Sequence, residues 1–285
     1  TIEPTASFWD CPEFISCAEK LQVGHPPGAP FYMLVGNLFT QFASEASQVS
    51  WLVNFLNALL SAGCILFLFW SITRLVRSLI INEEQNLSTM DVIVILGSGF
   101  VGALAYTFSD TFWFSAVEGE VYAFSSFLTA LVFWMILRWQ DESDSVYGDR
   151  WIILIAYIIG LSIGVHLLNL LCIPAIVLVF YYQKYHAISF KGVAAAIVIS
   201  GLLIVFILFV YIPGIADMGG WFELLFVNVF GLPFHTGLIV FLALTFLVLV
   251  GAIYRFRKRM LHTSLWCLLM LTVGYTTYAV ILIRA

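Results

Sequence analysis

Acidic residues and a histidine crowd into a short polar stretch near the start of the chain. Asp10 and Glu13 are three residues apart, which places them on one face if the segment is helical. His25 follows within a rigid His-Pro-Pro turn. A carboxylate that is partly removed from water can act as a general base, and a histidine can donate a hydrogen bond to a phosphate. The stretch therefore indicates proton transfer beside an anionic group.

The same residues also fit a purely structural interpretation. Asp10 could cap a helix, with Pro12 in its first turn and Glu13 at the capping-box position. His25 could belong to an ordinary turn. Trp9, directly before Asp10, suits either a membrane interface or a substrate-binding surface. The sequence leaves open which of the two carboxylates is a base and which is only a cap.

A second polar cluster lies in the middle of the chain. Glu118 and Glu120 lead directly into an apolar run, where acidic residues usually face an internal cavity and mark a site. Helical spacing places Glu118 and Tyr122 on one face and turns Glu120 elsewhere. Further along, His166 and Asn169 stand at positions i and i+3 between two apolar runs. We expect these residues to bind substrate or phosphate, although an interfacial loop and a structural histidine are the alternatives.

Other kinds of site are not supported by the residue spacing. Gly97 to Gly102 reads G-x-G-x-x-G, but the apolar run continues through it, so close packing of membrane helices is favoured over a dinucleotide site. No metal-ligand spacing occurs, and neither a metal ion nor another cofactor is expected, although a divalent metal would leave no signature here. Cys11 and Cys17 could pair in an oxidising compartment, but six residues along a helix place them on different faces.

The elements that must position these residues are membrane helices. The chain of 285 residues is 62% hydrophobic and only 10% charged, whereas a soluble domain is nearer a quarter charged. Its apolar runs of about 20 residues predict helices rather than a barrel. We expect an all-α polytopic transmembrane helical bundle of about eight spans: 51–72, 91–109, 121–137, 151–165, 167–182, 193–212, 237–254 and 264–283.

The basic residues predict the orientation of these spans. With eight spans, ten of the twelve Lys and Arg residues fall in loops on one side, and only Lys20 and Arg284 on the other. The positive-inside rule assigns the first side to the cytoplasm. Both polar clusters, the His166 turn and a loop over 213–237 then face outward. No nucleic acid is expected as a partner.

The first fifty residues are predicted to form one outer region. Pro30 suits a first helical turn, and the segment Pro30–Gln48 carries apolar residues and a polar stripe at helical spacing. This segment is too short to span and is predicted to be an interfacial helix on the outer face. We expect a single transmembrane domain over 1–285, with the outer region in 1–50 and the helical bundle in 51–285. The start without methionine and the abrupt apolar end predict that this chain is a piece of a longer protein.

Five segments together resemble a known family. They are "TIEPTASFWDCPEF", "VGHPPGAPFYMLVGNLF", "DTFWFSAVEGEVYAFSSF", "GLSIGVHLLNLLCIPA" and "GYTTYAVILIRA". In this order they resemble a bacterial multi-spanning family related to the eukaryotic transmembrane protein O-mannosyltransferases, which has a GT-C-like fold. The resemblance implies transfer of a sugar, a mannose-like hexose, from a polyprenyl-phosphate donor on the outer side of the membrane. In that family the essential acid lies in the first outer loop, after the first span. The resemblance therefore implies that a first span before Thr1 and a C-terminal region after Ala285 are missing from this chain.

Carried onto this sequence, the resemblance makes Asp10 the essential acid and Glu13 its backup. The His25-Pro26-Pro27 turn resembles elements that frame the donor. One base and a phosphate leaving group suggest a single displacement with inversion. The departing phosphate needs cationic or hydrogen-bond donors, and few are expected on the outer side: His25, His166, Lys20 and Arg284.

The expected protein is therefore a multi-pass enzyme of the bacterial inner membrane whose site faces the periplasm. Its partners would be the lipid bilayer, a polyprenyl-phosphate sugar and a secreted or periplasmic protein that accepts the sugar on serine or threonine. Trp9, Glu118, Glu120, Tyr122 and Asn169 are the expected substrate-binding residues. A transporter or flippase for a lipid-linked or sugar substrate is the alternative, and a non-catalytic scaffold is a third.

Overall fold

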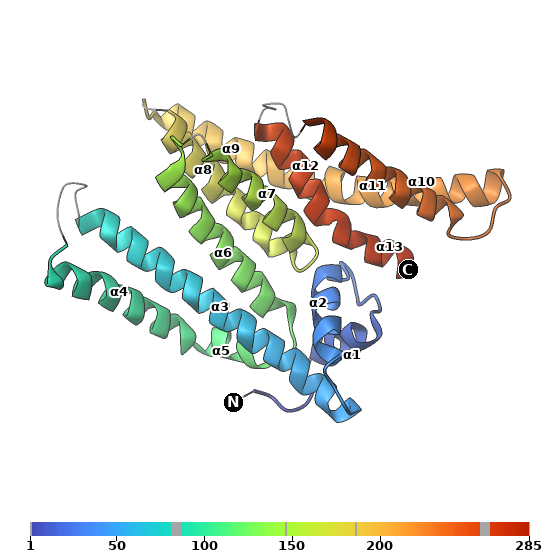
Figure 1. Cartoon of the computed structure of the whole chain (residues 1–285), viewed down its shortest axis with the longest axis horizontal. Helices are drawn as coiled ribbons and strands as arrows, with labels where there is room; N and C mark the ends of the chain where they lie inside the picture. Colours follow the sequence, from blue (N-terminus) through green and yellow to red (C-terminus); the bar gives the residue numbers. More distant parts are fainter. Residues whose placement is uncertain (1, 81–86, 146, 186, 257–262, 285) are drawn as a thin grey trace. The chain divides into compact units, whose positions relative to one another are not determined.

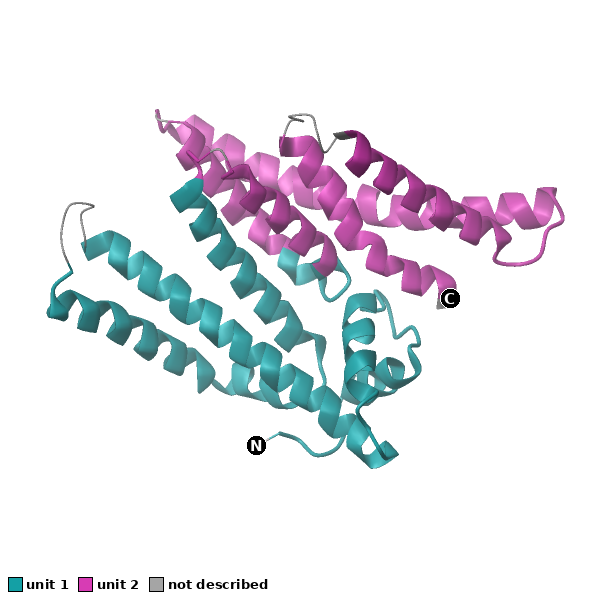
Figure 2. Cartoon of the chain, in the orientation of Figure 1, with its two compact units in different colours: residues 1–142, 162–169 teal, residues 143–161, 170–285 magenta. Residues whose placement is uncertain are grey.

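Helices make up most of the part of the chain that the structure describes, and short loops and turns connect them (Figure 1). The computed structural model describes residues 2–80, 87–145, 147–185, 187–256 and 263–284. In these residues seven helical stretches, three of which join adjacent elements, are long and apolar enough to cross a membrane. The prediction of an all-α polytopic bundle is confirmed. The chain divides into two compact units, residues 1–142 with 162–169, and residues 143–161 with 170–285 (Figure 2).

Unit 1 holds six helices and the turn at 162–169. They are α1 (Cys11–Lys20), α2 (Pro30–Thr40), α3 (Ala46–Ile80), α4 (Thr89–Thr107), α5 (Asp110–Val117) and α6 (Val121–Glu142). The long helix α3 packs against α4 and α6 and also contacts α1, α2 and α5. With 35 residues it is about 50 Å long, more than the thickness of the hydrocarbon core. The helix α3 is therefore the element on which the rest of unit 1 is assembled.

The glycine-rich segment of α4 packs closely against α3. A Cβ atom on Gly99 would lie 2.5 Å from Thr73 Cγ2, and one on Gly102 would lie 2.5 Å from Ile72 Cδ1. The helix runs without a break through all three glycines after a capping box formed by Ser88 and Asp91. Helix packing is thus the structural role of the G-x-G-x-x-G sequence, as the apolar run predicted.

The helix predicted over Pro30–Gln48 is shorter than expected. The helix α2 ends at Thr40, and α3 begins at Ala46. Part of its polar stripe faces the protein, because Asn37 Nδ2 donates to the carbonyl oxygens of Ala18 and Glu19, at 2.8 and 3.1 Å. These bonds attach α2 to the end of α1. An interfacial position for α2 stays a prediction.

Unit 2 contains the remaining helices. They are α7 (Asp149–Ile163), α8 (Cys172–Lys184), α9 (Phe190–Phe206), α10 (Ile212–Leu224), α11 (Thr236–Phe256), α12 (Thr263–Tyr275) and α13 (Ala279–Arg284), with the short turns η1 (Leu167–Leu171), η2 (Ile207–Tyr211), η3 (Leu225–Val229) and η4 (Thr276–Tyr278). The exceptions are the end of α7 and the first three residues of η1, which belong to unit 1. Helices α7 and α12 approach at two glycines. A Cβ on Gly160 would lie 2.2 Å from the Leu271 oxygen, and one on Gly274 would lie 2.4 Å from the Tyr157 oxygen.

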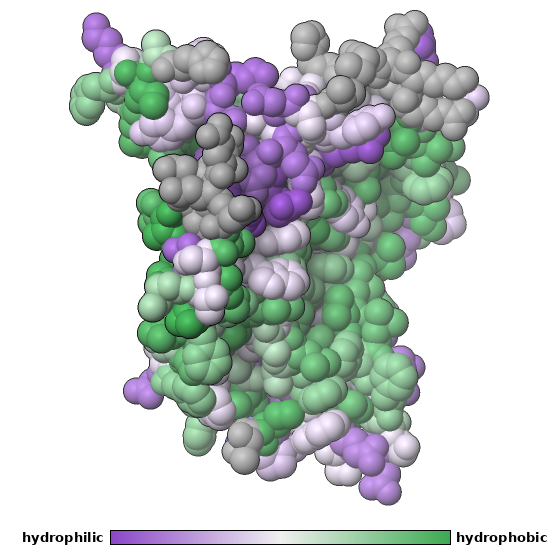
Figure 3. Space-filling view, turned by 60° about the vertical axis from the view of Figure 1, so that its left-hand side comes forward, coloured by the Kyte–Doolittle hydropathy of each residue, from purple (hydrophilic) through white to green (hydrophobic). Residues whose placement is uncertain are grey.

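Two predicted boundaries in this part of the chain differ from the structure. The loop expected over 213–237 is helical as far as Val229, because Pro213 lies within the first turn of α10 and directly follows the π-helical segment η2. A wider turn of this kind accommodates a proline inside a helical run. The fourth predicted span corresponds to α7, which has 15 residues and is shorter than the seven candidate spans. On the face drawn in Figure 3, hydrophobic residues cover the middle of the helices, and hydrophilic residues gather mainly toward their ends.

Candidate active site

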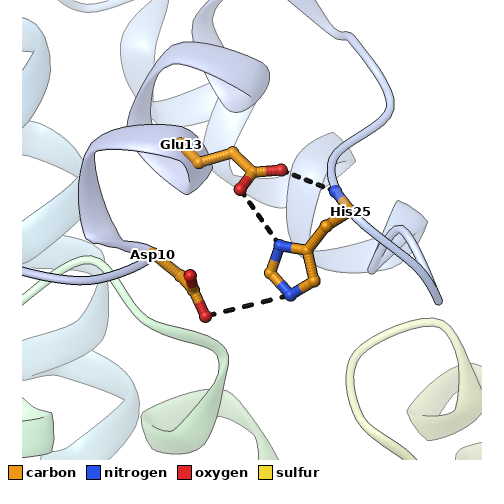
Figure 4. A group of neighbouring side chains, drawn as sticks. All are labelled: Asp10, Glu13 and His25. Carbon is orange, nitrogen blue, oxygen red and sulfur yellow. Dashed lines mark hydrogen bonds and ion pairs between the residues drawn. The ribbon is translucent and has the colours of Figure 1, made fainter.

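The first polar cluster is built on α1 and the loop that follows it. Glu13 lies in the first turn of α1 and accepts two hydrogen bonds from His25, one from the backbone N–H at 2.5 Å and one from Nδ1 at 3.0 Å (Figure 4). Gly24 lies so close that a Cβ there would be 3.0 Å from Glu13 Oε1. The carboxylate of Glu13 therefore connects the His-Pro-Pro turn to α1.

Asp10 occupies the N-cap position of α1, yet its side chain makes no capping hydrogen bond. Only its backbone oxygen takes part, accepting from the Phe14 N–H at 2.9 Å. The carboxylate points toward His25, with Oδ2 3.8 Å from Nε2, and about half of the side chain is exposed (Figure 4). Asp10 is therefore the carboxylate whose oxygens remain available for another group.

A cavity of about 790 Å³ opens beside Asp10 within unit 1. Its lining includes four acidic residues, Asp10, Asp110, Glu118 and Glu120. Aromatic and hydroxyl side chains complete the wall: Phe8, Trp9, Tyr106, Thr111, Phe112, Phe114, Ser115, Tyr122 and Ser126. Asp10 of the first polar cluster and Glu118, Glu120 and Tyr122 of the second thus line one cavity.

Asn57 on α3 holds the second cluster in place. Its Nδ2 donates to the backbone oxygens of Glu118 and Glu120, at 2.5 and 2.6 Å, and its Oδ1 accepts from the Tyr32 hydroxyl at 3.2 Å. All three bonds are buried, where an unsatisfied partner would be costly. One turn earlier, Asn54 donates to the backbone oxygens of Glu3 and Thr5. The two asparagines fix the segments that carry the acidic residues.

Glu118 and Glu120 are both buried, each about 6% exposed. Ser7 Oγ donates to the carboxylate of Glu118. Burial raises the pKa of Glu120 to about 7, with smaller contributions from the negative charges of Asp10 and Glu118. Glu120 is therefore a carboxylate that can change its protonation state near neutral pH.

The prediction that Glu120 points away from Glu118 was wrong. The helical spacing on which it rested does not apply, because α5 ends before Glu118 and α6 begins at Val121. Glu118 has an extended backbone with φ −127° and ψ 154°. The link then bends at Gly119, where the Glu120 N–H donates to the Glu118 oxygen at 2.9 Å. Glu118 and Glu120 both line the cavity.

One group of side chains has the composition of a metal site. Ligand atoms of Asp10, Glu13 and His25 all lie within 4.8 Å of one another. Carboxylate oxygens and an imidazole nitrogen could hold a divalent cation. Glu13 and His25, however, already satisfy each other by hydrogen bonding. The residues would fit a metal ion, but their arrangement does not require one.

Comparison with known proteins shows the family of this helical chain. Residues 10–189, more than half of its 285 residues, match a family described as the protein O-mannosyl-transferase TMEM260 N-terminal domain. The chain belongs to this family. The match begins at Asp10 and includes both polar clusters and the turn at 162–169. The predicted relation to the eukaryotic O-mannosyltransferases is thereby confirmed.

Curated relatives of the TMEM260 type are similar over about half of the chain. Protein O-mannosyl-transferase tmem260 of Dictyostelium discoideum is 23% identical over 133 residues, which cover 46% of this chain and 14% of that protein. Protein O-mannosyl-transferase TMEM260 of Mus musculus is 26% identical over 154 residues, which cover 54% of this chain and 19% of that protein. The matched segments are thus less than a fifth of either relative. No solved structure matches this chain.

The turn at 162–169 contributes one predicted residue to the neighbourhood of the cavity in this TMEM260-type domain. The ring of His166 lies 5.5 Å from that of Tyr122, which lines the cavity. Asn169 is buried, and its Oδ1 accepts hydrogen bonds from Ser125 and Thr129 on α6. These bonds explain Asn169 as a connection between this turn and α6. Its predicted contact with substrate is untested.

The other two predicted phosphate-binding residues do not join the cluster. Lys20 is exposed in the last turn of α1, about 15 Å along the helix from Asp10, and does not line the cavity. Arg284 ends α13 in unit 2, and its side chain lies outside what the structure describes. Among the predicted cations, His25 is the group beside Asp10.

Some residues of the site were not singled out in the sequence. Asp110 and Tyr106 line the cavity, and Asn57 and Ser7 hold its acidic segment. Asn57 carried a usable signal, since an amide inside a long apolar helix marks a functional or packing position. Ser7 carried none, because its bond to Glu118 crosses 111 residues of sequence.

Proposed function

We propose that this chain is the membrane part of a glycosyltransferase that transfers a mannose-like hexose to serine or threonine hydroxyls of a protein. The donor is a polyprenyl-phosphate sugar, and the reaction takes place on the outer face, the periplasmic side of a bacterial inner membrane. Membership of the TMEM260 N-terminal domain family supports the reaction class. The observation that carries the proposal is that the Asp10 carboxylate is free of capping bonds and lines the acidic cavity.

In the proposed reaction Asp10 is the general base. The acceptor oxygen attacks the anomeric carbon, and its proton passes to a carboxylate oxygen of Asp10. The new bond joins the acceptor oxygen to the sugar, while the bond from the anomeric carbon to the phosphate oxygen breaks. The electron pair of that bond leaves with the phosphate. A single displacement of this kind inverts the configuration of the sugar.

His25 is the proposed donor to the leaving phosphate. Its Nε2 faces Asp10, and Glu13 holds its other ring nitrogen. The hydrogen bond to Glu13 raises the pKa of His25 from its ordinary value, which favours the protonated imidazole. A positive donor fixed in advance beside the reacting bond stabilises the charge that develops on the phosphate. Glu13 is thereby assigned to positioning, and Asp10 to proton transfer.

The test is transfer from a labelled polyprenyl-phosphate mannose to a serine peptide by the full-length protein in lipid nanodiscs. Loss of a general base lowers rates by about 10²–10⁴-fold. We expect Asp10→Asn to lose at least about 100-fold. Glu19→Gln is the matched control, because Glu19 is an exposed acid of α1 outside the cavity. Wild-type rates in Asp10→Asn would exclude Asp10 as the base.

Two further arms of this assay separate the alternatives. We expect transfer to continue in EDTA, since the proposed donor to the phosphate is His25. Loss in EDTA that Mg²⁺ or Mn²⁺ restores would instead indicate an ion at Asp10, Glu13 and His25. Movement of labelled donor across sealed vesicles without any transfer to peptide would favour the transporter or flippase.

A further inference from the structure

The charged residues that line the cavity beside Asp10 are all acidic. Four carboxylates line it, those of Asp10, Asp110, Glu118 and Glu120, and none of its described lining residues is Lys, Arg or His. Among the described residues, no Lys or Arg forms an ion pair with any of these four acids. A concave surface of one sign attracts ligands of the opposite sign and repels those of its own. A phosphate is therefore disfavoured in this cavity, and a cation is favoured.

Glu120 points to a ligand in its own right. A buried carboxylate is costly unless a positive charge accompanies it, and Glu120 is about 6% exposed. Burial raises its pKa to about 7, and the backbone hydrogen bond from Val121 and the charge of His25 offset only part of this effect. An arriving cation would supply the ion-pair partner that no described Lys or Arg provides. Asn57 donates hydrogen bonds to the backbone oxygens of Glu118 and Glu120, which fixes the position of these two residues in the wall of the cavity.

The aromatic part of the wall indicates what kind of cation fits. Trp9 is 91% exposed at φ 60°, a left-handed conformation that is unfavourable for a bulky residue. Tyr106 and Phe112 pack with ring centroids 4.4 Å apart, and Tyr122 adds a third ring. Aromatic faces together with carboxylates bind organic cations such as guanidinium and ammonium groups. A bare metal ion would leave most of about 790 Å³ and all of these rings without a contact.

We propose that this acidic, aromatic cavity binds a lysine or arginine side chain of the acceptor polypeptide, close to the accepting hydroxyl. The inference rests on the proposed function, because it takes Asp10 as the base that meets this hydroxyl. His25 lies 3.8 Å from Asp10 at Nε2 and does not line the cavity. The donor phosphate then belongs with His25, and the acceptor segment with Glu118 and Glu120. Charge thus divides the site into a donor side and an acceptor side.

Binding can be measured without transfer. The probes are fluorescent peptides with one serine and one lysine placed one or two residues before or after it, each paired with the same peptide carrying norleucine in place of lysine. Binding to the full-length protein in nanodiscs is followed by fluorescence anisotropy with no donor present. We expect roughly tenfold tighter binding of the best lysine peptide, as one desolvated ion pair would give. We also expect this preference to fall with added salt.

Three variants identify the cavity as the source of the preference. Glu120→Gln should bind the lysine and norleucine peptides about equally. Asp110→Asn should reduce the preference for lysine, and it serves as the test if Glu120→Gln does not fold, because Asp110 is an exposed position on α5. Glu19→Gln should keep it. Equal binding of lysine and norleucine peptides at every position by the wild-type protein would overturn the inference. A preference that Glu120→Gln and Asp110→Asn both retain would overturn it as well.

The transfer and binding assays distinguish a failure of this inference from a failure of the proposed function. Transfer to serine peptides without any preference for lysine would leave the glycosyltransferase intact and remove the cationic subsite. A preference in binding without transfer would leave the cationic subsite and remove the reaction. Excess Mg²⁺ that displaces the lysine peptide, with an affinity that Glu120→Gln lowers, would assign the cavity to a metal ion instead.

Discussion

Asp10 and Glu13 have the same chemistry and lie on the same turn of α1, yet their surroundings differ. Glu13 is occupied by two hydrogen bonds from His25, whereas Asp10 faces the cavity. The backbone bond from His25 is the main cause of the lowered pKa of Glu13. A carboxylate that is already bound is a poor proton acceptor, because accepting a proton would break those bonds. These surroundings favour Asp10 over Glu13 as the proposed base.

The Glu13–His25 pair predicts a pH window for the stability of the site. Glu13 contributes stability above its ordinary pKa of 4.5, which is lost as pH falls through its lowered pKa. His25 contributes stability below its ordinary pKa of 6.5, which is lost as pH rises through its raised pKa. Both contributions are complete between these ordinary values. We expect Glu13→Gln to lower the unfolding free energy most in this window, by no more than about 1 kcal/mol because the pair is partly exposed.

Thermal unfolding of the full-length protein in detergent at pH 3, 5.5 and 9 measures this effect. The difference in Tm between wild type and Glu13→Gln should be largest at pH 5.5, whereas Glu19→Gln should show no such maximum. A difference that stays constant across the three pH values would remove the ionic interpretation and leave a neutral hydrogen bond.

At the scale of elements, the break between α5 and α6 decides the shape of the site. A continuous helix through 118–120 would have turned Glu118 and Glu120 in different directions. The non-helical link lets both line the cavity, and the Asn57 amide donates to the backbone oxygens of Glu118 and Glu120 on either side of the bend. The site therefore depends on α3 as much as on the residues that carry the charge.

The packing of α3 against α4 can be tested with two glycines of one helix. Gly99→Ala should destabilise unit 1 by about 1–3 kcal/mol, because the new Cβ would meet Thr73 Cγ2 at 2.5 Å. Gly97→Ala is the matched control, since a Cβ there meets nothing within 4 Å. The control should be neutral or slightly stabilising, as alanine is the better helix former.

Reversible unfolding in detergent, compared between the two alanine variants, gives the measurement. Equal stability of Gly99→Ala and Gly97→Ala would mean that α4 does not pack on α3 at this glycine.

At the scale of the whole molecule, unit 1 has two chemically different ends. The N-terminal half of α3 carries Asn54 and Asn57, which hold the acidic segments. Its C-terminal half carries Arg74, which is bound to Asp141, and Arg77. Basic residues at the far end of α3 favour a cytoplasmic position for that end and an outer position for the cavity.

Accessible cysteines test this orientation. Ser16→Cys on α1 and Ser78→Cys near the end of α3 are both exposed positions within unit 1. A membrane-impermeant maleimide should label Ser16→Cys in intact cells and Ser78→Cys only after the membrane is permeabilised. The wild-type protein gives the background, to which the partly exposed Cys172 and Cys267 contribute more than the buried Cys11, Cys17 and Cys64. The opposite pattern would place the cavity in the cytoplasm and contradict the proposed side of transfer.

The amino-acid sequence alone determined the class of the protein and where its chemistry is concentrated. Apolar runs, few charges and the glycines of α4 give membrane helices directly, because each depends on composition or on the spacing of neighbouring residues. The clusters around Asp10 and Glu118 were also visible, since charges beside apolar runs stand out locally. The family resemblance depended on the order of such segments.

Only the tertiary structure decided what surrounds each acidic residue. It separated Asp10 from Glu13 through His25, turned Glu120 into the cavity beside Glu118, and brought Asn57 behind both across 61 and 63 residues of sequence. Hydrogen bonds between residues so far apart in the chain leave no periodic pattern in the sequence. They depend on which helices pack together and not on the spacing of residues within any one helix. The physical reason is that local pattern sets which face of a segment is apolar, whereas the partner of a polar side chain is chosen by the fold.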